Sequence, residues 1–273
     1  MITDKNILID SHCHINFGGY DEIIEDILKR CAENSIEQVW DIGTDINSSK
    51  KSISMAKEHP EIKSFIGIDP EVFVPGSEYF VGFDKNDEWI EQMFNELNNL
   101  IEENKDYVIG IGESGLDHYW FKEKSKEDQE NSSRLQEQLF KMHLELARKH
   151  NLPLSIHSRG AEKLCLEIVR KYNVTGIFHS FTGNYQTAKG ILDAGWGLGV
   201  NGIVTFKNSN DLREVYKKLL SGRKFESPID FYNQGIFFET DSPFLAPEGK
   251  RGEQNEPYTI ALIYDNFIKN LSF

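Results

Sequence analysis

The sequence predicts an α/β fold, and within that class a single TIM-type (β/α) barrel with parallel strands inside and helices outside. Short apolar, β-branched runs alternate along the chain with longer segments whose apolar residues recur every three or four positions. This alternation is typical of parallel strands joined by helices. The chain has 273 residues and no linker-like or low-complexity stretch. We therefore expect residues 1–273 to form one domain.

The predicted elements follow one another as strand, helix, strand along the chain. The apolar runs predict strands at Leu8–Ser11, Gln38–Ile42, Phe65–Ile68, Val108–Ile111, Leu154–His157, Gly176–His179, Gly197–Val200 and Ile236–Glu239. The helical periodicity predicts helices at Asp21–Asn34, Trp89–Lys105, Leu135–His150, Ala161–Tyr172 and Leu212–Leu220. Stretches with neither pattern are expected to be long loops, and these are Pro75–Glu88, His118–Ser133 and Ser221–Asn233.

The composition is that of a globular protein with a full core, at 39% hydrophobic and 27% charged residues. The apolar runs are far shorter than the ~20 residues that span a bilayer. Three cysteines without a CxxC pair argue against a disulfide framework. The N-terminus lacks a signal-peptide pattern, so we expect a cytoplasmic protein with no membrane partner and no obligate protein partner. The net charge of −14 should repel nucleic acid, although bound divalent ions can reverse the local sign.

A pair of histidines, His12 and His14, follows the first predicted strand. Residues two apart in a strand share a face, so both imidazoles can reach one cation. Cys13 points to the opposite face and is expected to pack rather than to bind metal. Asp10 shares the parity of the histidines and could orient one of them, with a buried structural aspartate as an equal alternative. Alone, the pair is a weak indication of a metal site.

Further residues of ligand type stand at the ends of other predicted strands. In a β/α barrel the carboxyl ends of the strands form the face on which active sites are built. The alternative is that each is an ordinary polar residue at the end of a strand, which the placement of the whole set disfavours. Six donors exceed what one tetrahedral catalytic ion can use, so we predict two divalent ions (Mg²⁺, Mn²⁺ or Zn²⁺) bridged by Glu113. The predicted metal ligands are His12, His14, Glu113, His157, His179 and Asp241.

The other histidines have different predicted roles. His59, His143 and His150 lie in or near predicted helices, where a structural role is favoured. His118 lies five residues after Glu113 in a predicted loop. It is a candidate substrate-binding residue, with simple exposure as the alternative.

A series of segments runs through nearly the whole chain, from about residue 8 to residue 257: IDSHCHI, GIGESGLDHY, LPLSIHSRGA, GIFHSFTGN, GIVTFKNSNDLREV and FFETDSPFLAPEGKRGEQNEP. In this order they resemble the signature blocks of the TatD-like metal-dependent hydrolases, which are TIM-barrel enzymes related to the amidohydrolases and include deoxyribonucleases. The resemblance implies hydrolysis of phosphodiester bonds, often as a 3′→5′ exonuclease on DNA. It also implies a division of the ligands, with His12, His14 and Asp241 on one metal, His157 and His179 on the other, and Glu113 between them.

The chain departs from the family pattern near the expected path of the substrate. His118 stands where the family has a tyrosine, and Glu253 and Gln254 replace two basic residues. The second change removes two positive charges. None of the six ligand positions is altered, so the predicted metals are better supported than the binding of long DNA.

The resemblance leads to a hypothesis of hydrolysis by a metal-activated water. Two cations about 3.5–4 Å apart would lower the pKa of the water and polarise the phosphate, and Asp241 would act as the general base. Arg159 and Lys207 are candidate phosphate contacts. The equal alternative is that each is an ordinary cationic side chain on the surface. Base-reading elements are absent from the sequence, so little sequence preference is expected.

Two rival functions use the same residues. The first is an amidohydrolase or lactonase acting on a small carbonyl substrate. Many such enzymes bridge their metals with a carbamylated lysine on the fourth strand, but Val108–Gly112 contains no lysine. The second is a non-catalytic metal-binding barrel, which the cost of retaining buried unused charges disfavours.

Overall fold

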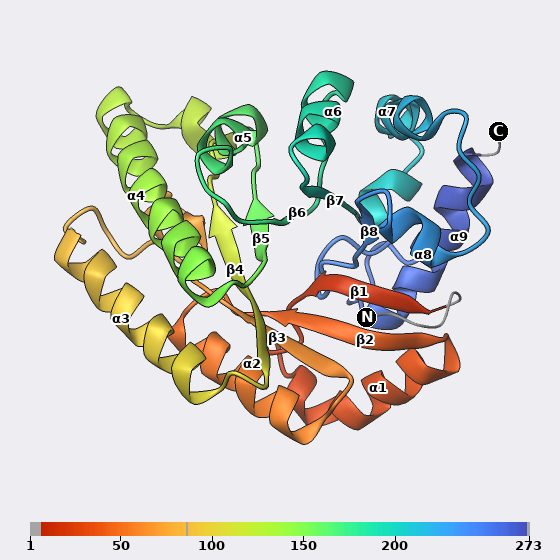
Figure 1. The fold of residues 1–273 in the computed structure, drawn as a ribbon, viewed down its shortest axis with the longest axis horizontal. Coiled ribbons are helices and arrows are strands. Elements are labelled where there is room, and N and C mark those ends of the chain that lie inside the picture. Colours follow the sequence, from red (N-terminus) through yellow and green to blue (C-terminus); the bar gives the residue numbers. More distant parts are fainter. Residues whose placement is uncertain (1–6, 86, 272–273) are drawn as a thin grey trace. The chain divides into compact units, whose positions relative to one another are not determined.

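A computed structural model describes residues 7–85 and 87–271 (Figure 1). In these residues eight strands form one sheet whose order follows the chain. The pairs β1–β2, β3–β4, β4–β5, β6–β7 and β7–β8 are parallel. The strands are β1 (Leu8–Cys13), β2 (Ile36–Ile42), β3 (Ile62–Ile66), β4 (Val108–Gly115), β5 (Leu154–His157), β6 (Gly176–Phe178), β7 (Gly197–Val200) and β8 (Ile236–Phe238).

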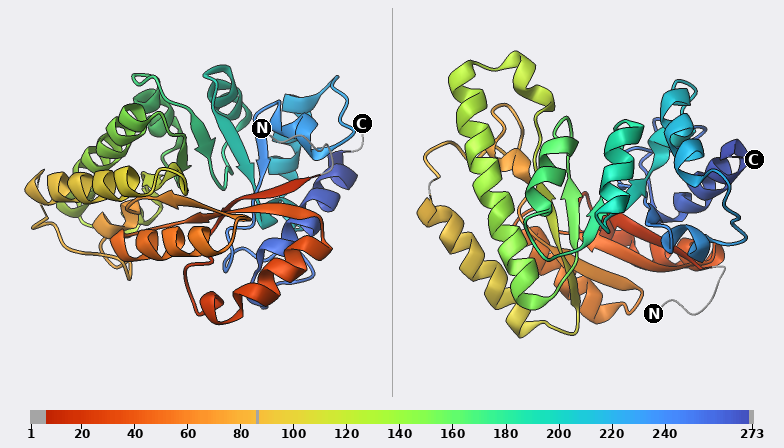
Figure 2. Two further views of the ribbon diagram at one scale, coloured as in Figure 1. Left: turned by 60° about the horizontal axis from the view of Figure 1, so that its bottom comes forward. Right: turned by 45° about the horizontal axis from the view of Figure 1, so that its top comes forward.

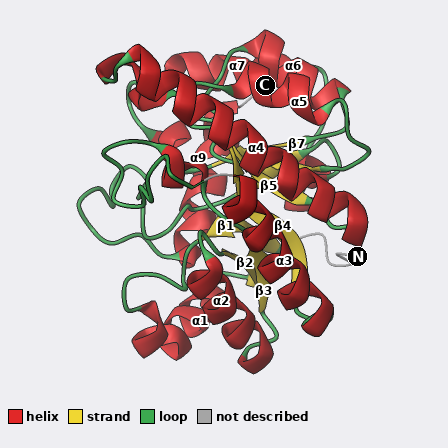
Figure 3. Cartoon of the chain, turned by 90° about the vertical axis from the view of Figure 1, so that its left-hand side faces the viewer, coloured by secondary structure: helices red, strands yellow, loops and turns green. Residues whose placement is uncertain are grey.

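Helices alternate with these strands along the chain (Figure 3). The α-helices are α1 (Ile24–Glu33), α2 (Ile46–Glu58), α3 (Asp87–Glu103), α4 (Lys126–His150), α5 (Glu162–Val169), α6 (Tyr185–Asp193), α7 (Asn210–Leu220), α8 (Pro228–Tyr232) and α9 (Ile260–Leu271). Short 3₁₀ helices are η1 (Tyr20–Ile23), η2 (Pro70–Phe73), η3 (Tyr119–Glu123), η4 (Gly202–Thr205) and η5 (Pro257–Thr259). No helix in the described part of the chain is both long and apolar enough to cross a membrane.

The first and the last strand are joined by hydrogen bonds. The Ser11 hydroxyl donates to the Phe238 carbonyl at 2.9 Å. Beyond the strand ends, the Asp241 amide donates to the His12 carbonyl at 2.9 Å and the His14 amide to the Ser242 carbonyl at 2.7 Å. A sheet that runs in chain order and joins its first strand to its last is a barrel. The predicted fold class is therefore confirmed.

The chain divides into two compact units. Unit 1 consists of Met1–Asp41, His59–Lys63 and Ile177–Phe273, and unit 2 of Ile42–Glu58 and Ser64–Gly176. The prediction of a single domain over residues 1–273 stays a prediction.

Each unit has its own buried core. In unit 1 the Phe238 ring of β8 packs against Phe267 of α9 and Phe231 of α8, with centroids 5.4 and 5.6 Å away. These two helices lie beside β8, at the blue end of the chain in Figure 2. In unit 2, α3 and α4 run side by side, linked by the Lys149 ammonium donating to the Asn98 side chain at 2.6 Å. Burial of apolar side chains, such as Leu97 of α3 and Phe140 of α4 in unit 2, is the main favourable term in folding, at about 25 cal/mol per Å² of apolar surface.

The stretch His118–Ser133, predicted to be a loop, is mostly helical, so this prediction was wrong. It contains η3, and α4 begins at Lys126. Ser125 caps α4 by accepting a hydrogen bond from the Asp128 amide at 3.1 Å, and acidic residues fill the first turn. Capping and charge at the helix dipole therefore outweigh the weak apolar periodicity of this polar sequence.

The other two predicted loops have mixed outcomes. Ser221–Asn233 contains α8, whose N-terminus has a capping box formed by Ser227 and Asp230. Pro75–Glu88 is irregular up to residue 85, Asn86 lies outside the described residues, and Asp87 and Glu88 already belong to α3.

Candidate metal centre

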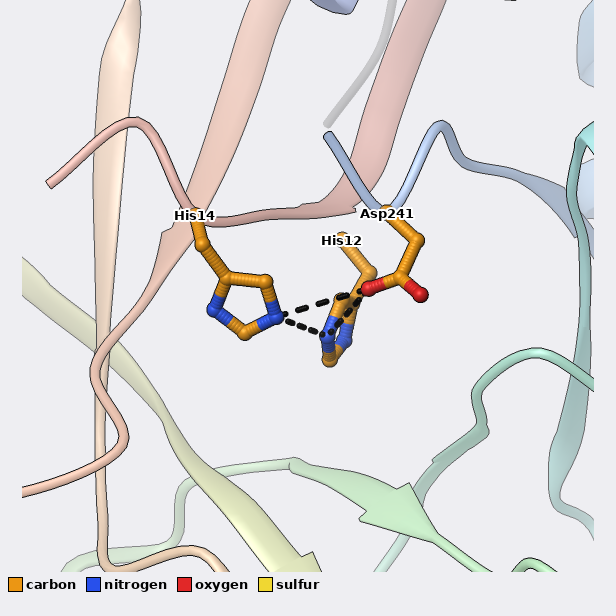
Figure 4. Close-up of side chains that lie close together, drawn as sticks. All are labelled: His12, His14 and Asp241. Carbon is orange, nitrogen blue, oxygen red and sulfur yellow. Dashed lines mark hydrogen bonds and ion pairs between the residues drawn. The ribbon is translucent and has the colours of Figure 1, made fainter. Parts of the chain in front are cut away.

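Three predicted ligands of unit 1 converge on one another. Figure 4 shows the imidazoles of His12 and His14 facing each other, with the Asp241 carboxylate beside them. The two Nε2 atoms are 3.2 Å apart. The Asp241 Oδ1 atom lies 3.4 Å from His14 Nε2 and 3.7 Å from His12 Nε2. All three residues offer donor atoms that suit one divalent cation.

The local backbone explains why these side chains meet. Strand β1 alternates its side chains, which places His12 and His14 on one face and turns Cys13 to the other. The Cys13 thiol is buried and donates to the Trp40 carbonyl at 3.3 Å, so it packs as predicted. Asp241 has a positive φ of 57°, a conformation that aspartate tolerates better than most residues. Its amide is fixed on the carbonyl of His12, and this bond ties the carboxylate to the imidazole.

The charge balance of this cluster favours a cation. His12 is fully buried and His14 is 6% exposed. The Nε2 atoms of His12 and His14 and the Oδ1 atom of Asp241 all lie within 3.7 Å of one another, so the three donor atoms are close enough to share one cation. A divalent ion can bind all three donors at once and would offset the charge of the partly buried carboxylate.

A further imidazole and carboxylate stand beside this cluster within unit 1. The His179 ring stacks on His12 with centroids 3.8 Å apart and an angle of 8°. Its Nδ1 atom lies 3.7 Å from Glu239 Oε1. Burial raises the pKa of Glu239, although the hydrogen bond and charge of His179 oppose this. The other oxygen of Glu239 is buried without a hydrogen-bond partner among the described residues, which again favours a cation.

Asp10 is fully buried and held by hydrogen bonds, and whether it orients a metal ligand stays a prediction. Its carboxylate accepts hydrogen bonds from the Thr240 amide at 2.9 Å and from the Thr240 hydroxyl at 2.5 Å. It also accepts from the His12 amide at 3.4 Å. Burial raises the pKa of Asp10, while these bonds to Thr240 lower it. Asp10 thus joins β1, which carries His12, to the segment after β8, which carries Asp241.

Unit 2 holds the remaining predicted ligands, Glu113 on β4 and His157 at the end of β5. These strands are paired in parallel, with Gly115 opposite His157. The His157 Nδ1 atom lies 2.9 Å from Glu113 Oε1, and its Nε2 atom lies 3.0 Å from Asp117 Oδ2. Glu71 joins Asp117 and His157 as a third possible ligand. One imidazole is therefore held between carboxylates.

The electrostatics of the unit 2 cluster are dominated by its acidic groups. Burial lowers the pKa of His157, but the hydrogen bonds that its ring donates to Asp117 and Glu113 outweigh this effect and leave the pKa well above its ordinary value. Burial and the nearby Glu113 charge raise the pKa of Asp69. Burial also raises the pKa of Glu71. Several carboxylates around a single imidazole form a site that a divalent cation would stabilise.

The structure groups the six predicted ligands by unit. His12, His14, His179 and Asp241 come together in unit 1, and Glu113 and His157 in unit 2. Sharing of Glu113 between two metals stays a prediction.

The sequence reasoning missed three carboxylates that accompany these ligands, namely Glu71, Asp117 and Glu239. Asp117 lies within the quoted segment GIGESGLDHY, and Glu239 is the last residue of a predicted strand. Their positions beside strand ends were therefore visible, but a carboxylate there has many possible roles. Nothing in the pattern around Glu71 distinguished it from a surface residue.

The three candidate substrate contacts have different surroundings. His118 is half-buried and stacks on Phe121 with centroids 4.3 Å apart, and burial lowers its pKa. The Arg159 guanidinium lies 3.7 Å from the centre of the Tyr119 ring. The Lys207 ammonium is 3.9 Å from a Glu248 oxygen, and its side chain is 91% exposed. The role of each toward a substrate stays a prediction.

Comparison with known proteins gives matches over nearly the whole chain. The family described as TatD related DNase matches residues 9–272. An uncharacterized metal-dependent hydrolase of Buchnera aphidicola is 32% identical over 258 residues, which cover 92% of this chain and 86% of the relative. The uncharacterized metal-dependent hydrolase YabD of Bacillus subtilis is 28% identical over 272 residues, covering 98% and 93%. The crystal structure of YjjV, a TatD homologue from Escherichia coli, has the same fold with a TM-score of 0.77 at 21% identity, covering 96% and 90%.

Proposed function

This chain belongs to the family of TatD-related DNases, a family of metal-dependent hydrolases, and from that premise we propose that it hydrolyses phosphodiester bonds of DNA. We propose a 3′→5′ exonuclease with little sequence preference that uses two divalent ions. The observation that carries the proposal is the pair of buried clusters in which imidazole and carboxylate donors face one another. Such donors are costly to bury without a cation.

The donor sets fit divalent metals in the way the family resemblance implies. His12, His14 and Asp241 would hold one ion, and His157 and His179 the other, with Glu113 as the bridge. Divalent ions, when bound, supply Lewis-acid polarisation of the phosphodiester and lower the pKa of a water molecule. Two divalent ions would offset the negative charge of the carboxylates in both clusters, which lowers the repulsion of a phosphate despite the net charge of −14.

Asp241 is the proposed general base. Its side chain is 14% exposed, whereas that of His12 is fully buried, so its carboxylate can meet a water molecule from the solvent. The amide bond to His12 and the turn closed by the Phe244 amide, which donates to the Asp241 carbonyl at 2.8 Å, hold it in place. A fixed carboxylate can orient the water and accept its proton as the water attacks phosphorus.

The proposal is tested by incubating the full chain with single-stranded DNA labelled at its 5′ end. We expect a ladder that shortens from the 3′ end with Mg²⁺, Mn²⁺ or Zn²⁺, and none when a chelator is present. DNA that stays intact with every ion would overturn the nuclease assignment. In that case, turnover of a lactone or another small carbonyl ester with the same ions would favour the amidohydrolase alternative. Internal nicking of DNA blocked at its 3′ end would contradict the exonuclease part alone.

A further inference from the structure

Two large aromatic side chains are exposed directly after β4, on the stretch that follows Asp117. Tyr119 is 51% exposed and Trp120 is 38% exposed. Their rings meet edge to face with centroids 4.9 Å apart. Exposed aromatic rings gathered in one place mark a binding surface more often than scattered single ones do.

A cation lies against these rings. The Arg159 guanidinium carbon is 3.7 Å from the centre of the Tyr119 ring and 5.6 Å from that of Trp120. Within residues 7–85 and 87–271, Arg159 forms no ion pair, although the chain carries an excess of acidic groups. Arg148 of the same unit, by contrast, is paired with Glu145 at 2.6 Å. Stacking occupies a face of the guanidinium and leaves its in-plane N–H groups free for an external anion.

The aromatic surface is fixed to the unit 2 cluster by hydrogen bonds. The Tyr119 amide donates to Asp117 Oδ1 at 2.9 Å, and the other oxygen of this carboxylate lies 3.0 Å from His157 Nε2. The His118 amide donates to the Arg159 carbonyl at 2.9 Å, and the Leu116 amide to the His157 carbonyl at 3.0 Å. A single carboxylate therefore positions both a predicted metal ligand and the backbone of the aromatic surface.

We propose that Tyr119, Trp120 and Arg159 form a stacking platform for an unpaired nucleobase of the DNA strand that is cut. A base would stack on the exposed aromatic and guanidinium surfaces, and the N–H groups of Arg159 would bind an adjacent phosphate. This proposal rests on the proposed function, because it assigns the substrate contacts of the same site. A stacked base must leave its duplex, so the platform selects single-stranded or frayed ends. Stacking is tolerant of sequence because every base has a flat face.

The binding test uses the full chain with Asp241→Asn, which removes the proposed base so that DNA binding is read without turnover. The probe is fluorescent oligo(dT), measured by anisotropy. We expect Tyr119→Leu and Trp120→Leu each to weaken binding about tenfold, whereas Tyr119→Phe keeps the ring and the affinity. The control is Tyr172→Leu, a similar change at a half-buried tyrosine that follows α5.

A second probe separates stacking from a structural effect. Oligo(dT) with abasic residues in its last positions should bind the Asp241→Asn chain about tenfold more weakly than normal oligo(dT). The abasic probe should bind the Tyr119→Leu and Trp120→Leu variants no more weakly than it binds the Asp241→Asn chain that keeps both rings. Without a base on the probe there is no stacking for these substitutions to remove. Equal binding of both probes by the Asp241→Asn chain, or additive losses in the variants, would overturn the platform. Base-dependent binding by the Asp241→Asn chain, together with a wild-type chain that cuts no phosphodiester with any ion, would overturn the proposed function and leave the platform standing.

Discussion

The two donor clusters are built from the same residue types in opposite proportions. In unit 1 the imidazoles of His12 and His14 face each other at 3.2 Å and share the carboxylate of Asp241. In unit 2 the single imidazole of His157 has a carboxylate on each ring nitrogen, Glu113 at 2.9 Å and Asp117 at 3.0 Å. The first cluster is rich in nitrogen lone pairs, and the second is rich in negative charge.

This difference determines whether a cation must displace a proton when it binds to each cluster. The raised pKa of His157 favours the protonated form of its imidazole while no metal is bound, whereas a metal ligand must be deprotonated. Binding in unit 2 therefore releases a proton, and its affinity should rise with pH. In unit 1 the Asp241 carboxylate lies farther from the ring nitrogens, at 3.4 Å from His14 and 3.7 Å from His12. We therefore expect metal binding to depend more strongly on pH in unit 2 than in unit 1.

The largest effect is expected from Asp241→Asn, which tests the unit 1 cluster. The substitution keeps the shape of the side chain but removes both its charge and its ability to accept a proton. Loss of a general base costs about 10²–10⁴-fold in rate, so we expect DNA hydrolysis to fall by at least about 10²-fold. The rate is measured on single-stranded DNA at saturating metal.

The fold should survive this change, because the amide of residue 241 still donates to the His12 carbonyl. Thermal unfolding in the presence of a chelator provides the control and should match that of the wild-type chain. Wild-type turnover in the variant would exclude Asp241 as the base.

A smaller effect is expected from Asp117→Asn, which tests the unit 2 cluster. Asp117 holds His157 from the side opposite Glu113. Loss of such a supporting carboxylate typically costs about 10–100-fold in metal affinity or activity. The side-chain carbonyl oxygen that the substitution leaves can still accept from the Tyr119 amide, so the backbone should not move.

The decisive measurement for Asp117→Asn is the titration of His157 followed by ¹⁵N NMR without metal. Its pKa should fall, because one of the two carboxylates that raise it has gone. A purely structural role would change stability and leave this pKa where it was. An unchanged pKa together with unchanged metal affinity would contradict the role given to Asp117.

A third prediction compares His157 with His143, a histidine of the same unit whose pKa is governed by burial and not by carboxylates. Burial lowers the pKa of His143 to about 3, and its Nε2 atom accepts from the Ile68 amide at 3.0 Å. Between pH 6.5 and 3 the unfolded chain binds a proton at this residue and the folded chain does not. His143 therefore destabilises the folded state as the pH falls below 6.5, by up to about 1.4 kcal/mol per pH unit.

The test is urea unfolding at pH 7, 6 and 5 for the wild-type chain and for His143→Gln. Glutamine can accept from the same amide but does not titrate in this range. The variant should lose less of its unfolding free energy between pH 7 and pH 5. Parallel pH profiles would show that His143 does not contribute to acid sensitivity.

The fold was predictable because its pattern is local and repeated. All eight predicted strands overlap observed ones, and the sheet order follows the chain. The predictions failed where capping outweighs apolar periodicity. Helix α4 begins at Lys126, nine residues before the predicted start at Leu135. The SKED sequence at Ser125 is a capping pattern that the reasoning did not weigh.

The site was predictable to the extent that ligand spacing follows strand geometry. The two-residue spacing of His12 and His14 predicts imidazoles on one face, and their Nε2 atoms do meet. The supporting role of Asp117 could not be read from the sequence, because it depends on the distance between two loops. The stacking of Arg159 on Tyr119 depends on contact between residues 40 positions apart in the chain, and spacing along the sequence does not reveal it.

The smallest effect is expected at Lys207, the unit 1 counterpart of Arg159 among the candidate phosphate contacts. Arg159 is held against an aromatic ring and keeps its N–H groups oriented. Lys207 has a side chain that is 91% exposed, with a distant partner in Glu248 at 3.9 Å. Such a side chain loses rotamer entropy when it binds a phosphate, and salt screens its charge.

Lys207→Ala should therefore weaken oligo(dT) binding by less than about threefold, and only at low salt. Arg159→Ala, measured in parallel, should lose about tenfold at any salt because it also removes the stacked surface. Equal losses in the two variants would show that charge alone, and not the fixed geometry of unit 2, governs the contact with DNA.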